Sequence, residues 1–86
     1  MKLILCKHCK DVVKLKHQKT SCDCGKCWGW YVDDLNAVIN KEAIPIGLAN
    51  SSLINAIRFR PEFGQGSKFE AFVIPKDCET IEVVDE

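Results

Sequence analysis

The chain has 86 residues, of which 47% are hydrophobic and 28% are charged. This length predicts one small domain over residues 1–86, and no apolar run approaches the roughly 20 residues of a membrane span. The formal net charge is zero, which argues against a strongly basic nucleic-acid-binding chain, although residues 1–31 carry a balance of +5 and residues 32–86 one of −5.

The predicted elements are short strands separated by turns, with one helix in the second half. Alternating apolar residues predict strands at residues 2–6, 11–20, 28–32, 69–75 and 80–84. The stretch 69–75 is expected at the centre of a sheet, because both of its alternating faces are apolar. Residues 35–50 stay undecided between a partial helix and a loop or short strand.

Residues 51–60 predict a helix of about ten residues. Asn50 or Ser51 is its expected N-terminal cap, Leu53, Ile54 and Ile57 share one face, and Pro61 stops it. A flexible loop is expected at residues 62–68, and the chain ends in an acidic stretch at residues 84–86.

Six cysteines dominate the first half of the sequence. The first residues lack the apolar core of a secretory signal, so a reducing cytoplasmic location is expected, where cysteine richness favours metal binding over disulfides. Cys6 and Cys9 have the C-x-x-C spacing of a metal-binding turn. The second pair is either Cys24 with Cys27, by spacing, or Cys22 with Cys24, because Gly25 follows at once and glycine suits a sharp turn.

Zinc is the expected metal and iron the alternative, because four thiolates suit both. Four sulfur ligands leave no coordination position for water, so the metal is expected to be structural. Cys78 and His17 lack a motif that would link them as nucleophile and base, and His8 and His17 are expected to be exposed. No enzymatic activity is therefore predicted.

The cysteine pairs, the short strands and the helix together predict a small α+β protein. Its N-terminal part, residues 1–34, is expected to be a zinc ribbon, a β-hairpin with two cysteine knuckles. Residues 35–86 are expected to form an α+β extension in which a short helix and a few antiparallel strands pack on the ribbon.

The segments CKHC, CDCGK, WGWYVDD, AIPIGLANSSLINAIRFRP and FEAFVIPKDC together resemble an uncharacterised family of small zinc-ribbon proteins encoded by bacteriophages and prophages. The resemblance runs from Cys6 to about Cys78. It implies a phage origin and a place in the host cytoplasm. In that family a small residue often replaces the cysteine at the place of Cys27, so the resemblance favours Cys22 and Cys24 as ligands beside Cys6 and Cys9. It implies no known activity.

Two further groups of residues are candidates for ligand binding. Trp28 and Trp30 alternate along one strand, where they form either a stacking platform for bases or a cover for the zinc and the start of the core. The second half of the chain offers donors for a phosphate or carboxylate. These are Asn50, Ser51, Ser52, Arg58, Arg60, Lys68 and Lys76.

Two functions follow from these features. The first is a non-enzymatic, zinc-binding phage-type module that captures a host protein or a small anionic, nucleotide-like ligand, as an inhibitor of host defence does. The alternative is a nucleic-acid-binding zinc ribbon, in which Lys14, Lys16, Lys19 and Lys26 contact phosphates and the tryptophans stack on bases. The oligomeric state is left open.

Overall fold

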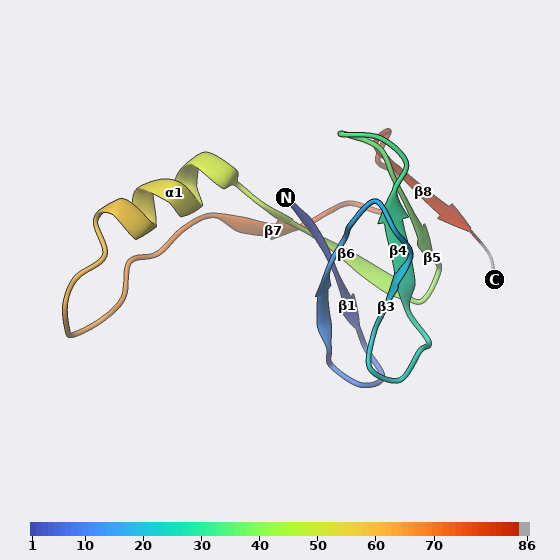
Figure 1. Ribbon diagram of the computed structural model, residues 1–86, viewed down its shortest axis with the longest axis horizontal. Helices are drawn as coiled ribbons and strands as arrows, with labels where there is room; N and C mark the ends of the chain where they lie inside the picture. Colours follow the sequence, from blue (N-terminus) through green and yellow to red (C-terminus); the bar gives the residue numbers. More distant parts are fainter. Residues whose placement is uncertain (85–86) are drawn as a thin grey trace.

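The computed structural model describes residues 1–84, which form eight strands in two sheets and one helix (Figure 1). Residues 85 and 86 of the predicted acidic end lie outside the described residues. The elements in chain order are β1 Lys2–Cys6, β2 Val12–Lys14, β3 Thr20–Ser21, β4 Trp28–Tyr31, β5 Ala37–Asn40, β6 Ala43–Leu48, α1 Asn50–Arg58, β7 Ala71–Val73 and β8 Ile81–Val84.

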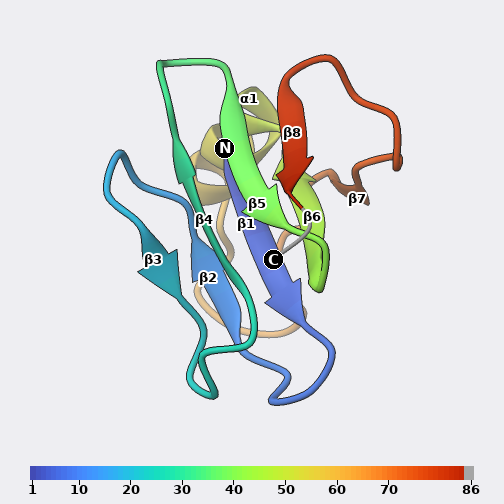
Figure 2. The same cartoon turned by 90° about the vertical axis from the view of Figure 1, so that its right-hand side faces the viewer.

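Each sheet combines strands from both halves of the chain. The first sheet has the order β2-β1-β6-β7 and is antiparallel throughout. The second has the order β3-β4-β5-β8, in which β8 runs parallel to β5 (Figure 2). Because β1 pairs with β6 and β4 pairs with β5, residues 1–34 are tied by backbone hydrogen bonds to the rest of the chain in both sheets.

The two cysteine turns close two separate hairpins. We expected one hairpin between them, but β2 pairs with β1 in the first sheet and β3 pairs with β4 in the second. The predicted strand 11–20 is divided because Leu15 enters the core, where it is 1% exposed, and the chain then crosses to the other sheet. Each hairpin thus presents one pair of cysteines at its turn.

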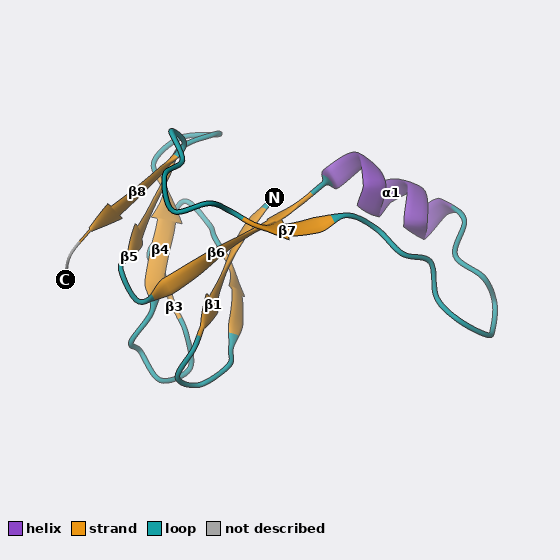
Figure 3. Ribbon diagram, turned by 180° about the vertical axis from the view of Figure 1, so that it is seen from behind, coloured by secondary structure: helices purple, strands orange, loops and turns teal. Residues whose placement is uncertain are grey.

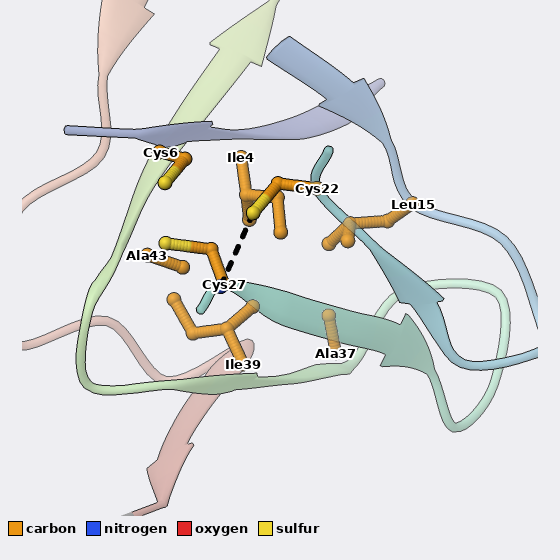
Figure 4. Packing of buried hydrophobic residues seen from close by; sticks show 8 residues of the cluster. All are labelled: Ile4, Cys6, Leu15, Cys22, Cys27, Ala37, Ile39 and Ala43. Atoms are coloured by element: carbon orange, nitrogen blue, oxygen red, sulfur yellow. Dashed lines mark hydrogen bonds between the residues drawn. The ribbon is translucent and has the colours of Figure 1, made fainter. Parts of the chain in front are cut away.

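The core draws side chains from both sheets. Ile4 and Ala43 come from the first sheet and Ala37 and Ile39 from the second, and Leu15 joins them from the crossing segment (Figure 4). All four residues of β5 are buried, so the undecided stretch 35–50 contains a central strand followed by β6. Strand β5 could not be predicted from periodicity, because its four residues, AVIN, are too few and do not alternate between apolar and polar.

The strand predicted at residues 69–75 forms in part, as β7, but its predicted position at the centre of a sheet is wrong. Strand β7 is the edge of its sheet, and all three of its residues are exposed, so its apolar faces are not covered by neighbouring strands. Phe72 lies against Gly47 of β6, where a Cβ atom would come within 2.6 Å of its ring. The ring nevertheless stays 55% exposed.

Helix α1 confirms the helix predicted at 51–60, but it stands away from the sheets (Figures 1 and 3). Its N-terminal cap is Ala49, with no side-chain hydrogen bond, so the expectation of Asn50 or Ser51 at that position is wrong. None of its residues is buried. We call residues 50–70, the helix and the loop that returns to β7, the arm. Within residues 1–84 no helix is long and apolar enough to cross a bilayer.

Candidate metal centre and tryptophan face

The two cysteine turns repeat the same backbone pattern. In each turn the N–H of the first cysteine donates to the carbonyl five residues later, Cys6 to Asp11 and Cys22 to Cys27, at 2.9 Å in both. The residue after the second cysteine has a positive φ in both turns, 63° at Lys10 and 80° at Gly25. The predicted role of Gly25 is confirmed, since its missing Cβ removes the cost of this conformation.

Backbone donors also point at the sulfurs of the first cysteines. The N–H of Cys9 lies 3.5 Å from Cys6 Sγ, and the N–H of Cys27 lies 3.3 Å from Cys22 Sγ. A hydrogen bond to the charged form of an acid favours that form. The N–H of Cys9 accordingly lowers the pKa of Cys6 to about 6. Burial is the largest single influence on Cys22 and opposes its ionisation, but the Cys27 N–H together with the Cys24 and Cys9 side chains lowers the pKa of Cys22 overall.

Four sulfurs gather where the two turns meet. The Sγ atoms of Cys6, Cys9, Cys22 and Cys24 all lie within 4.8 Å of one another. The distances from Cys24 Sγ to Cys6 Sγ and to Cys22 Sγ are both 3.6 Å. A tetrahedral zinc site with Zn–S bonds of about 2.3 Å places its sulfurs about 3.8 Å apart. The cluster therefore has the donor set and the spacing to hold one metal ion.

Cys27 is not one of these four. It lies in the core beside Ile39 and Ala43, fully buried, and contributes its backbone N–H to Cys22 (Figure 4). Burial and the neighbouring Cys6 sulfur raise the pKa of Cys27 to about 12. Although the Lys26 N–H lowers it, burial and the Cys22 and Cys6 sulfurs raise the pKa of Cys24 to about 12 as well. The position of the sulfurs, and not their pKa, therefore separates Cys27 from the four-sulfur cluster.

The two turns are also joined directly. Asp11, at the end of the first turn, accepts a hydrogen bond from the N–H of Asp23 in the second, at 2.9 Å. Neither histidine belongs to the cluster, since His8 faces Glu42 at 3.3 Å and His17 faces Asp34 at 4.0 Å. Both are exposed, as predicted. The sulfur cluster thus lies between two hairpins from different sheets, which the Asp23–Asp11 hydrogen bond joins.

Trp28 and Trp30 lie on the outer face of β4 and not in the core cluster. Their rings stack with centroids 5.6 Å apart and an interplanar angle of 16°. The opposite face of β4 is occupied by Gly29, where a Cβ atom would lie 2.8 Å from the Val38 carbonyl oxygen and 2.9 Å from Ile39 Cγ2. The tight inner packing at Gly29 therefore directs both large rings outward.

One lysine contacts these rings, and a second lysine precedes them in the chain. Lys19 Nζ is 4.6 Å from the Trp28 ring centroid, within range of a cation–π contact. Lys26 is exposed two residues before Trp28. Its carbonyl accepts a 2.6 Å hydrogen bond from Asn40, whose side-chain oxygen in turn accepts the Trp28 N–H at 3.1 Å. Asn40 is buried, and no sequence pattern indicates this bridge. We call Lys19, Lys26, Trp28 and Trp30 the tryptophan face.

The structure separates the other candidate ligand-binding residues. Ser51, Ser52 and Lys68 line one open concavity on the arm, but Ser52 Oγ already accepts the N–H of Glu70 at 2.8 Å. Asn50 accepts a hydrogen bond from the N-terminal ammonium at 3.0 Å. The remaining three are exposed elsewhere: Arg58 at the end of α1, Arg60 in a second concavity of the arm, and Lys76 in a groove between the sheets.

The arrangement as a whole is a cluster of four sulfurs that could hold a metal ion, located where two hairpins meet, with a pair of stacked tryptophans and a lysine on one of the sheets. Comparisons with protein families, with curated proteins and with solved structures gave no match, so its function is argued from its own geometry.

Proposed function

We propose that this protein is a non-enzymatic binding module, in which a zinc ion stabilises the fold and the tryptophan face binds single-stranded nucleic acid. The observation that carries the proposal is that both tryptophans of the chain stack together outside the core, with Lys19 against one of them. This supports the alternative function predicted from the sequence over the capture of a protein or small anion.

The metal has a structural role in this proposal. When four cysteines fill a tetrahedral site, no position is left for a water or a substrate. Two of the four ligands, Cys6 and Cys22, are also members of the hydrophobic core. A metal bound there adds to the stability of a core with few fully buried side chains. Iron fits the same four sulfurs and is the second choice.

Stacking is the main source of affinity. Every base presents a π-face, so aromatic side chains bind single strands with little sequence preference, at roughly 1–3 kcal/mol per base. Trp28 and Trp30 are partly exposed and share one face of β4. Because their backbone is fixed by pairing to both β3 and β5, the platform is formed before the ligand arrives.

Charge indicates on which side of the platform the phosphates run. Lys19 and Lys26 are exposed, and no ion pair between described residues neutralises them. On the same outer face Glu82 of β8 lies beside Val38, next to Trp30. Phosphates avoid a carboxylate and are drawn to ammonium groups, so the strand is expected to pass over the β3 side of the sheet.

The first function predicted from the sequence receives less support from the geometry. Its donors, Asn50, Ser51, Ser52, Arg58, Arg60, Lys68 and Lys76, lie at separate places, and two of these side chains are engaged in hydrogen bonds. A small anion needs several donors that converge on one point.

Intrinsic fluorescence tests the proposal directly, because the chain has only two tryptophans and both belong to the tryptophan face. Titration with single-stranded oligo(dT) and oligo(U) at low salt is expected to quench this fluorescence, with an affinity that falls as salt rises. Charge reversal at Lys19 or Lys26 should weaken binding and reduce the salt slope by about 0.7 each. Trp30→Ala should weaken binding roughly tenfold.

Lys68→Glu on the arm is the matched control, since it changes the same charge far from the tryptophans. It is expected to bind like the wild type. Circular dichroism establishes that each variant is folded. Absence of quenching at low salt, or equal loss of affinity for charge reversal at Lys68 and at Lys19, contradicts the proposal.

A further inference from the structure

The arm leaves an unusually large apolar surface in contact with water. From residue 50 to residue 73 no residue is buried. Four phenylalanines lie in this segment, with exposed fractions of 73% at Phe59, 87% at Phe63, 41% at Phe69 and 55% at Phe72. Exposed apolar side chains in this number within one segment are typical of an interaction surface.

Helix α1 lacks the means to be stable alone. It has nine residues, no side-chain cap and no buried residue. Isolated helices shorter than about 12–15 residues are marginal in water, and most helical stability in proteins comes from burial of an apolar face. Ile54 and Ile57, the large apolar residues of its exposed surface, are 55% and 60% exposed. We therefore expect a partner surface to cover these two side chains and stabilise the helix.

The amount of surplus surface matches one side of a stable interface. A compact monomer of 9.7 kDa exposes about 5,100 Å², whereas this chain exposes 6243 Å², an excess of about 1,100 Å². Its radius of gyration is 14.2 Å, against about 12 Å for a compact chain of this length. A specific interface buries about 800 Å² on each partner.

We propose that the occupant is a second copy of this chain, and that the arms of two copies pair about a two-fold axis. A two-fold interface must be self-complementary, so the same arm has to carry both a projection and a recess. The arm has both. Phe63 projects at the loop, and Leu53, Ile57 and Phe69 line an apolar concavity of about 260 Å³ between helix and loop. Phe63 of each copy enters the concavity of the other.

Charge supports the same pairing. Arg60 is the one charged residue that lines the apolar concavity, and Glu62 precedes the projecting Phe63. Neither makes an ion pair among the described residues. When Phe63 enters the partner's concavity, Glu62 approaches the Arg60 of the partner, and the contact is repeated by symmetry. Ser51, Ser52 and Lys68 line the separate polar concavity, which stays in water.

Sedimentation velocity and light scattering on the full metal-loaded chain test this inference. We expect twice the chain mass at micromolar concentration. Phe63→Glu should give a folded monomer, or raise the dissociation constant roughly thirty-fold or more, since charge at a central aromatic contact removes a dominant contribution. Phe63 is 87% exposed, so its substitution leaves the packing within one chain intact.

Two further variants make the test specific. Arg60→Glu is expected to weaken the dimer, and the double variant Arg60→Glu with Glu62→Arg to restore it. Val12→Glu, on an exposed apolar residue of β2, should leave the dimer unchanged. A wild-type chain that stays monomeric throughout, or a dimer that Phe63→Glu does not weaken, overturns the inference. A heterologous protein as the occupant of the arm corresponds to the first of these outcomes.

Discussion

The two cysteine turns have the same backbone conformation at one equivalent position but different residue types there. Lys10 and Gly25 both follow the second cysteine of a turn, and both have a positive φ. A positive φ costs free energy for a residue with a Cβ and none for glycine. Lys10 therefore has a strained backbone. The residue type gives no sign of this, because lysine does not favour a positive φ.

Exchange of residue type at these two positions should shift stability in opposite directions. Lys10→Gly is expected to raise the free energy of unfolding of the metal-loaded protein by about 1 kcal/mol, and Gly25→Ala to lower it by about 1 kcal/mol. A Cβ at Gly25 would meet no atom within 4 Å, so only backbone strain contributes there. Urea unfolding at a fixed metal concentration measures both. Loss of stability in Lys10→Gly would show that its side chain, and not its φ, maintains the turn.

At the scale of elements, β4 has opposite packing on its two faces. The inner face has room only for a hydrogen at Gly29, while the outer face bears two indole rings. Periodicity predicted this strand correctly, and it placed Trp28 and Trp30 on one face. It could not tell which face was covered, because Leu15, Val38 and Ile39 approach Gly29 from distant parts of the sequence.

This packing predicts the cost of one added methyl group. Gly29→Ala should lower the free energy of unfolding by about 1–3 kcal/mol, because the new Cβ would overlap the Val38 carbonyl and Ile39. Gly66→Ala, where a Cβ meets nothing within 4 Å, is the matched control and should change stability by less than about 0.5 kcal/mol. Equal effects of the two substitutions, measured by thermal unfolding, would mean that β5 and Leu15 can move away from Gly29 at little cost.

Strand β7 and helix α1 show where local pattern misleads about environment. FEAFVIP is apolar on both faces, which is typical of a central strand, and α1 has an apolar face. Both elements form, and neither is buried within the chain. The apolar pattern is accounted for if the partner that covers it is a second copy, as inferred above.

For the whole molecule, the sulfur cluster lies between two hairpins in different sheets, and a metal ion bound there would link them. Cys6 and Cys22 belong at once to the metal site and to the core. Loss of the metal leaves thiols in their place and removes the attachment of one sheet to the other at this end. We therefore expect metal removal to unfold the chain cooperatively, because for such sites binding energy is folding energy.

Native mass spectrometry and circular dichroism check this expectation. One zinc ion per chain is expected in the wild type and in Cys27→Ala, whereas Cys22→Ala should lose it and unfold. A chelator should abolish the dichroism of the wild type, and lowering the pH should do the same, because protons compete with the metal for thiolates such as Cys6, whose pKa is about 6. Metal retained in Cys22→Ala but lost in Cys27→Ala would assign the ligands to the other pair.

The sequence by itself determined the two cysteine turns, the helix and most of the strands, because each depends on residues close together in the chain: cysteine spacing, a glycine after a cysteine, and local apolar periodicity. Only the tertiary structure decided which sulfurs meet, that Cys27 enters the core, that β7 is an edge and that the tryptophans face outward. These features depend on contacts between β1 and β6, between β4 and β5, and at Gly29, where residues far apart in sequence compete for the same space.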